Sequence, residues 1–198
     1  MGLAGIPWWT TDIGGFFGAN INDPEFHELL VRWFEYGCFC PVMRLHGYRW
    51  PLQPQYGTTG GATCVSGAPN EVWSYTDQVC EILSDYLRLR ERMLPYITEL
   101  MEEAHEKGTP VMRPLFYDFP EDKESWNVET EYMFGPKVLV KPITDADARE
   151  TDVYLPGGAS WTNAWTGETF EGGQKVHVAA PIEQIPLFTR DGYKLPMK

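Results

Sequence analysis

Two segments near the N-terminus combine acidic, basic and aromatic residues in a way that could hold a hydroxyl-rich ligand. The first reads WWTTDIGGF from Trp8, and the second reads MRLHGYR from Met43. A carboxylate and an imidazole hydrogen-bond hydroxyl groups, and aromatic rings stack on the apolar face of a sugar ring. The residues of interest are Asp12, Phe16, Arg44 and His46. Their types predict a sugar-binding site.

Each of these residues also has a purely structural interpretation. Asp12 could cap the turn that the following Ile-Gly-Gly forms, and His46 could be a satisfied core histidine. Arg44 could serve only as the partner of a carboxylate such as Asp12, and Phe16 could be ordinary core. The functional interpretation depends on finding all four residues at the ends of two consecutive predicted strands.

The elements around these residues resemble a βαβ unit. Gly2 to Pro7 and Phe39 to Leu45 are short apolar runs that we predict to be buried strands, and residues 8–22 between the first strand and the helix are predicted to be a loop. Asp23 and Pro24 are the N-cap and first residue expected of a helix, which Gly37 ends. A parallel sheet of this kind would place both segments at one end of a (β/α)8 barrel, where active sites lie.

The residue pattern in the rest of the chain predicts a loop, a long helix and a second domain. Residues 46–73 are rich in Gly, Pro and Thr and are predicted to be a loop. Residues 74–107 are predicted to be helical, with a break or kink at Pro95 and an end at Gly108. Short extended runs then alternate with turns, as in an antiparallel β domain: 111–116, 137–143, 152–155, 160–163, 175–178 and 186–190. We therefore divide the chain into residues 1–108 and 109–198.

Composition narrows the classes of partner. The 198 residues carry a formal net charge of −12 with no basic run, which argues against nucleic acid as a partner. No stretch approaches the ~18–20 apolar residues of a membrane span, and the first residues lack the pattern of a signal peptide. The 14% aromatic content fits ring stacking on a ligand, or equally an aromatic core.

The four cysteines do not predict a metal site. Cys38 and Cys40 are separated by one residue, whereas the cysteines of a zinc-binding pair are usually separated by two. Cys64 and Cys80 are far apart in the sequence and do not form a second pair. We expect four buried free thiols, which is consistent with a reducing compartment and leads us to expect a cytoplasmic protein.

Longer motifs make a specific resemblance visible. The segment from Trp8 to Phe16 resembles the W-x-x-D-I-G-G-F segment of glycoside hydrolase family 31, and RLHG from Arg44 resembles its arginine-x-histidine segment. Similar matches follow along nearly the whole chain: RMLPY from Arg92, GTPVMRP from Gly108, YMFG from Tyr132, VLVKP from Val138, YLP from Tyr154, and Trp161-Thr162 with Trp165. Glu131 and Lys141 depart from the family pattern, which has Gln and Ala there.

The resemblance implies a fold and an activity. It implies the last two βα units of a (β/α)8 TIM barrel followed by a C-terminal antiparallel β-sandwich domain. It also implies a retaining α-glucosidase or α-xylosidase that acts on an oligosaccharide or α-glycoside, without a metal or organic cofactor. The parent enzyme could be oligomeric.

The resemblance also assigns roles to residues. Asp12 and His46 correspond to residues that hydrogen-bond the sugar, Phe16 to an aromatic residue of the first subsite, and Trp9 and Arg44 to a wall and an orienting charge. The family's nucleophile and acid/base are expected upstream of Met1, so that no catalytic residue is expected in this chain. Two alternatives from other classes are a non-catalytic carbohydrate-binding protein and a scaffold role for the β domain alone.

Overall fold

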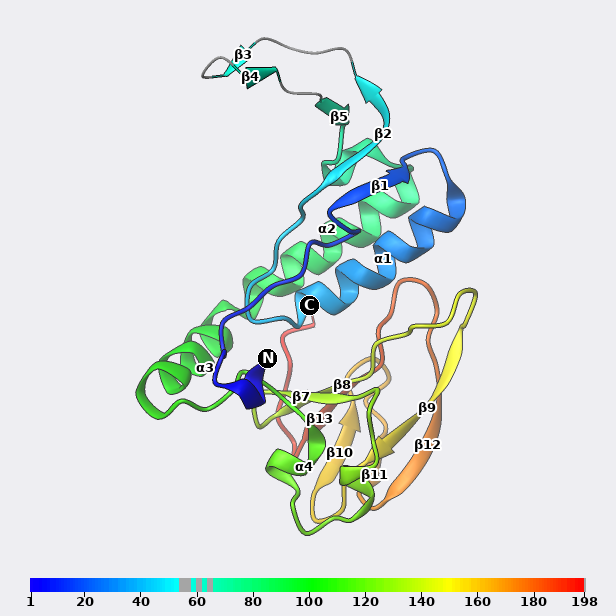
Figure 1. Ribbon diagram of the computed structural model, residues 1–198. Coiled ribbons are helices and arrows are strands. Elements are labelled where there is room, and N and C mark those ends of the chain that lie inside the picture. Colours follow the sequence, from blue (N-terminus) through cyan, green and yellow to red (C-terminus); the bar gives the residue numbers. More distant parts are fainter. Residues whose placement is uncertain (54–57, 60–61, 64–65, 198) are drawn as a thin grey trace.

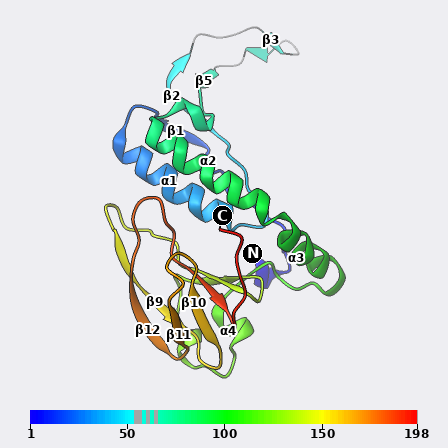
Figure 2. The ribbon, with the colours of Figure 1, turned by 180° about the vertical axis from the view of Figure 1, so that it is seen from behind.

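The computed structural model describes residues 1–53, 58–59, 62–63 and 66–197, which form a helical part and a β part (Figures 1 and 2). The helical part contains α1 (Pro24–Cys38), α2 (Asp77–Arg92) and α3 (Leu94–Lys107), with strands β1 (Phe17–Asn20), β2 (Tyr48–Gln53), β3 (Thr58–Thr59), β4 (Ala62–Thr63) and β5 (Ser66–Ala68). Single 3-10 turns lie at Gly2–Ala4, Val72–Ser74 and Glu124–Trp126. Both chain ends lie where the two parts meet.

Most helix ends lie where the sequence predicts, but α1 continues through Gly37 to Cys38, and α2 begins at Asp77 rather than at Ser74. The Asp23 carboxylate accepts a hydrogen bond from the backbone N–H of Glu25, and Pro24 occupies the first turn of α1. Pro95 breaks the long predicted helix, so that α2 ends at Arg92 and α3 starts at Leu94. Gly108 ends α3 with a left-handed φ of 71°. Helices α1 and α2 pack side by side and bury Leu30, Phe34, Leu83 and Tyr86 between them and their neighbours.

The prediction that Gly2 to Pro7 and Phe39 to Leu45 form strands is wrong. Gly2–Ala4 is a 3-10 turn whose Leu3 is 64% exposed, and Phe39 to Leu45 is an irregular segment. The parallel pairing starts later, where Phe17 of β1 aligns with Tyr48 of β2. Upstream of it the segments still run parallel, through one bridge between Ile13 and Leu45.

Glycines explain why the ladder between these segments is interrupted. Gly14 and Gly15 have φ of 81° and 84°, a conformation that no regular strand contains. They form a tight turn in which the Gly15 N–H donates to the Asp12 carbonyl at 2.7 Å. The run of residues therefore turns immediately after Asp12 instead of continuing as a strand.

The predicted loop over residues 46–73 also contains regular structure. Strand β2 pairs antiparallel with β5, with Arg49 aligned to Ala68, and β3 pairs with β4. Part of the predicted loop lies outside the described residues. In the next predicted run, 111–116, only Met112–Arg113 is a strand (β6), and Leu115–Asp118 forms the short helix α4.

The C-terminal part is an antiparallel β structure built from two sheets. The sheet order β11-β10-β13-β8-β7-β6 uses β7 (Tyr132–Phe134), β8 (Val138–Val140), β10 (Ser160–Asn163), β11 (Thr169–Glu171) and β13 (Leu187–Arg190), and a second sheet pairs β9 (Glu150–Leu155) with β12 (Gln174–Ala179). A separate core joins the sheets, because Leu139, Trp161 and Phe188 of one pack with Val153 and Val176 of the other. This arrangement is consistent with the predicted β-sandwich.

The two positions that depart from the family pattern lie next to each other in this domain. Lys141 Nζ lies 3.8 Å from Glu131 Oε1, and both Glu131 oxygens accept from the Tyr154 N–H. Burial raises the pKa of Glu131 to about 7, against the opposing effect of the Tyr154 hydrogen bond and Lys141. Lys141 therefore supplies a cation beside the carboxyl group that Glu131 introduces.

A buried polar network fastens the helical part to the β part. The Arg32 guanidinium donates to the carbonyls of Ala148, Ala180 and Pro181, and to Glu35 Oε2 at 3.1 Å. Tyr86 Oη lies 3.1 Å from Glu35 Oε1 and 3.2 Å from the Glu183 carbonyl oxygen.

The proton count in this network favours a neutral Glu35. A phenol has one proton, so Tyr86 can donate to one of its two acceptors only. If Tyr86 donates to the Glu183 carbonyl, a protonated Glu35 can donate to the phenol oxygen. Burial, the largest effect, raises the pKa of Glu35 to about 8, against the opposing effects of the Arg32 cation and of the hydrogen bonds from Arg32 and Tyr86.

Candidate functional site

Asp12 and Arg44 form an ion pair between the two parallel segments. Arg44 Nη2 donates to Asp12 Oδ1, and the side chains are 49% and 25% exposed for Arg44 and Asp12 respectively. The Gly14-Gly15 turn fixes where the Asp12 backbone points, and the Ile13 N–H donates to the Arg44 carbonyl at 3.3 Å. Because the pair is partly open to solvent, it contributes little to stability, and the hydrogen bond from Arg44 uses the Oδ1 atom of Asp12.

Phe16 and His46 lie next to each other on the same two segments. Their ring centroids are 5.6 Å apart with an angle of 34° between the planes, and both side chains are exposed. The backbone joins them as well, since the Tyr48 N–H donates to the Phe16 carbonyl at 3.2 Å. The structure thus brings Asp12, Phe16, Arg44 and His46 to neighbouring turns, on an exposed surface.

Trp9 does not lie with these residues. It lines a hollow of about 1010 Å³ whose walls include Thr11 and Trp33 but none of Asp12, Phe16, Arg44 and His46. The Trp33 indole N–H donates to Thr11 Oγ1 at 2.9 Å, which holds this side of the segment against α1. Successive residues of an extended segment face opposite sides, so Trp9 and Thr11 face the helix while Asp12 faces away.

Arg49 is a structural determinant of the site that the sequence did not reveal. Its side chain is fully buried, and Nη1 donates to the Gly15 carbonyl at 2.8 Å. Nη2 donates to the carbonyls of Ile13 at 3.2 Å and His46 at 3.5 Å. The guanidinium carbon also lies 5.2 Å from the centre of the Phe26 ring. Arg49 therefore ties the turn after Asp12 to the turn at His46. In the sequence, the position of Arg49 between two aromatic residues was the only feature that set it apart.

The two turns approach so closely that glycine is required at their contact. A Cβ atom on Gly47 would lie 2.2 Å from the Gly15 carbonyl oxygen, and the φ of Gly47 is 110°. A Cβ atom on Gly14 would lie 2.6 Å from Arg49 Nη2. The relative position of Asp12 and His46 thus depends on Gly14, Gly47 and Arg49.

The nearby thiols offer no nucleophile. Cys38 and Cys40 are buried, and burial raises the pKa of each to about 12, so both are protonated at neutral pH. Cys80 is only half-buried, contrary to the expectation for all four cysteines, and Cys64 lies outside the described residues. Within the described residues, no three His, Cys, Asp or Glu side chains are grouped so that they could hold a metal ion. No helix in that same part of the chain is long and apolar enough to cross a membrane.

Fold and site together define a class of protein. Parallel segments that end in polar and aromatic side chains, with helices packed on them and an antiparallel β domain following, correspond to the end of a TIM barrel joined to a C-terminal domain. Residues 1–100 match the Glycosyl hydrolases family 31 TIM-barrel domain, and residues 108–195 match the Glycosyl hydrolase family 31 C-terminal domain. The chain therefore belongs to glycoside hydrolase family 31.

Individual relatives are glycosidases. The alpha-xylosidase of Saccharolobus solfataricus is 38% identical over 195 residues, which are 98% of this chain and 24% of that protein. Alpha-glucosidase 2 of Bacillus thermoamyloliquefaciens is 36% identical over 193 residues, 97% of this chain and 22% of that protein. The chain therefore spans about a quarter of the length of these relatives.

Solved structures of enzymes from the same family have a fold similar to that of this chain. A GH31 alpha-xylosidase from a soil metagenome, complexed with xylose, is 51% identical with a TM-score of 0.93, over 98% of this chain and 29% of that one. The GH31 dextranase of Flavobacterium johnsoniae, complexed with glucose, is 32% identical with a TM-score of 0.81, over 97% of this chain and 22% of that one.

Proposed function

We propose that this chain supplies a sugar-binding wall and the C-terminal β domain of a retaining α-glycosidase that removes terminal α-linked glucose or xylose from oligosaccharides. In this proposal residues 1–108 are the last two βα units of the barrel. The observation that carries the proposal is the juxtaposition of Asp12, Phe16 and His46 on two neighbouring turns. The names of related enzymes, an alpha-xylosidase and an alpha-glucosidase, support the substrate class.

The chemistry of the juxtaposed groups suits a monosaccharide unit. The Asp12 carboxylate accepts hydrogen bonds from sugar hydroxyls, and Arg44 holds it in one orientation. The His46 ring can donate or accept, and the Phe16 ring beside it offers an apolar face. None of these side chains needs to change covalently, so their role is to bind and orient the sugar.

Under this proposal the two catalytic carboxylates are not among the residues of this chain. A retaining mechanism requires a pair of carboxyl groups about 5–5.5 Å apart, one as nucleophile and one as acid/base. Asp12 is the only carboxylate among the candidate residues, and Arg44 already binds it. We therefore expect the purified chain to release no aglycone from aryl α-glucosides or aryl α-xylosides, and clear turnover by a pure sample would contradict the assignment.

A chimera tests the positive part of the proposal. The matching segment of the Saccharolobus solfataricus alpha-xylosidase is replaced by this chain, and hydrolysis of aryl α-xyloside and aryl α-glucoside is measured. We expect an active chimera, and we expect His46→Ala to weaken sugar binding by about 1–3 kcal/mol, the cost of one hydrogen bond to a desolvated hydroxyl. An active chimera in which both Asp12→Ala and His46→Ala leave kcat/KM unchanged would exclude the proposed role. A folded but inactive chimera would favour the non-catalytic carbohydrate-binding protein.

A further inference from the structure

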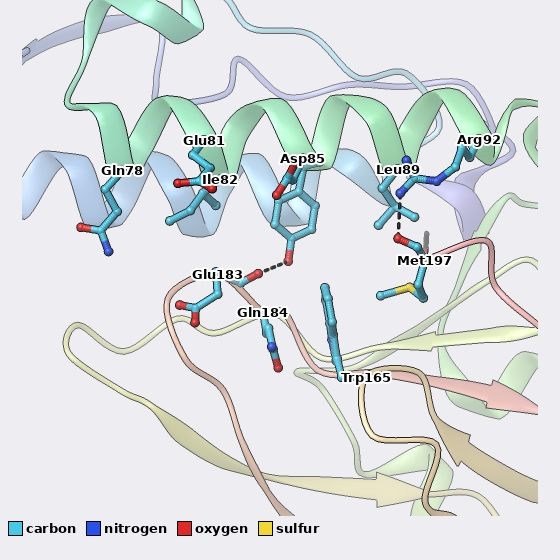
Figure 3. A pocket seen from close by; sticks show the side chains of 11 residues that line it. Gln78, Glu81, Ile82, Asp85, Leu89, Arg92, Trp165, Glu183, Gln184 and Met197 are labelled. Carbon is cyan, nitrogen blue, oxygen red and sulfur yellow. Dashed lines mark hydrogen bonds between the residues drawn. The ribbon is translucent and has the colours of Figure 1, made fainter.

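A groove of about 600 Å³ lies between helix α2 and the C-terminal domain (Figure 3). On one side α2 contributes Gln78, Glu81, Asp85 and Arg92, and on the other side Trp165 and Gln184 come from the β part. None of Asp12, Phe16, Arg44 and His46 lines it. Its volume falls in the range of small-molecule sites, which is about 300–1,000 Å³.

Trp165 is held rigidly at the floor of the groove. Its indole Nε1–H donates to the Ile185 carbonyl at 2.7 Å, and its backbone N–H donates to Asn163 Oδ1 at 2.9 Å. Figure 3 shows the ring standing between Gln184 and Met197 and reaching toward α2. An aromatic ring fixed in this way offers its face to a ligand at little cost in conformational entropy.

The polar groups around Trp165 are free to bind a ligand. Within the described residues, the side chains of Gln78, Glu81, Glu183 and Gln184 make no hydrogen bond or ion pair with the rest of the chain. Arg92 is committed, because Nε and Nη2 each donate at 2.8 Å to the carbonyls of Pro196 and Met197. The uncommitted groups are therefore carboxylates and amides, most of which accept hydrogen bonds.

The charge of the lining selects the class of ligand. Glu81, Asp85 and Glu183 outnumber the cation Arg92 in the lining, so the groove is acidic on balance and disfavours phosphorylated sugars, nucleotides and other anions. Hydroxyl groups donate well to carboxylates, and the C–H face of a sugar ring packs on an indole. We infer that this groove is a second saccharide-binding site that takes a neutral oligosaccharide, separate from the turns that carry Asp12 and His46. The choice of ligand rests on the proposed function, since it assumes a protein that meets oligosaccharides.

Nuclear magnetic resonance on the 15N-labelled 198-residue chain tests the site, with the Trp165 indole N–H as the probe. Isomaltotriose or maltotriose should shift this signal saturably with a Kd of about 1 mM, whereas glucose 6-phosphate should leave it in place. Glu81→Lys should raise the Kd about fivefold or more, the cost of one lost hydrogen bond. Glu91→Lys is the matched control on the same helix, exposed and outside the groove, and should leave the Kd unchanged.

Several outcomes would overturn the inference. These are a Trp165 signal that does not move, an equal response to glucose 6-phosphate, and an equal effect of Glu81→Lys and Glu91→Lys. A fourth is the loss of all saccharide binding in His46→Ala, which would place the sugar at the strand-end turns. That last result would remove the second site but leave the proposed function standing, because the chimera tests that function independently.

Discussion

Arg49 Nη1 donates a hydrogen bond of 2.8 Å to the Gly15 carbonyl oxygen, from a side chain that solvent does not reach. This contact joins the turn that carries Asp12 to the strand that follows His46. Among the described residues, the guanidinium also donates to the carbonyls of Ile13 and His46, it interacts with the Tyr75 hydroxyl, and no carboxylate pairs with it. The buried Arg49 guanidinium therefore sets the position of the candidate sugar-binding residues, because it donates hydrogen bonds to both turns that carry them.

We expect Arg49→Met to destabilise the chain by about 3 kcal/mol, because several carbonyls would lose a charged donor inside the protein. Arg49→Lys should recover only part of the loss, since an ammonium cannot reproduce the planar fork. The free energy of unfolding in urea measures both. Arg88→Met is the control, because Arg88 is exposed and its ion pair, with Asp85, is exposed as well; equal effects at the two positions would contradict the role of Arg49.

Gly47→Ala should be strongly destabilising, by about 3 kcal/mol or more, because it adds both backbone strain and a clash with the Gly15 carbonyl. Gly158→Ala separates these causes. Gly158 has a φ of 83° but nothing within 4 Å of the added Cβ, so it should lose only about 1 kcal/mol from strain. Thermal or urea unfolding of the two variants gives the comparison, and similar losses would show that the turns do not depend on their close approach.

Glu35 should make stability depend on pH. Unfolded, the carboxyl ionises near its ordinary pKa of 4.5, whereas folded it keeps its proton to about pH 8. The folded state thus binds more protons between these values, and the stability from Glu35 is full below pH 4.5 and is lost as the pH rises through 8. In Glu35→Gln the decline in the free energy of unfolding from pH 5 to pH 9 should be smaller by at least about 1 kcal/mol. Glu91→Gln, on an exposed position of α2, should retain the wild-type decline.

Hydrogen exchange should distinguish the two halves of the chain. The ladder between β9 and β12 pairs six residues of each strand in register, so the amides of residues 153–155 and 175–178 should be protected. In the irregular segment 39–45, the Val42 N–H has the Trp9 carbonyl as its partner, at 3.1 Å, outside any regular ladder. We expect much faster exchange there. Equal, strong protection in both halves of a monodisperse monomer would instead favour a self-sufficient binding protein.

Local sequence signals determined the helices and most of the C-terminal strands. Asp23-Pro24, Pro95 and Gly108 act on the backbone within one turn, so helix ends could be predicted without knowing what surrounds them. Strand 160–163 was likewise bounded by its own turn residues. The motifs around Asp12 and His46 also sufficed to indicate the family.

Tertiary contacts decided the rest. Whether an apolar run becomes a strand depends on a neighbour that offers a continuous ladder, and within the described residues the run 39–45 meets the parallel segment through a single bridge, between Leu45 and Ile13. Which side Trp9 faces depends on the packing of Trp33 on Thr11. The role of Arg49 depends on carbonyls up to 36 positions away, which no local pattern of residues can encode.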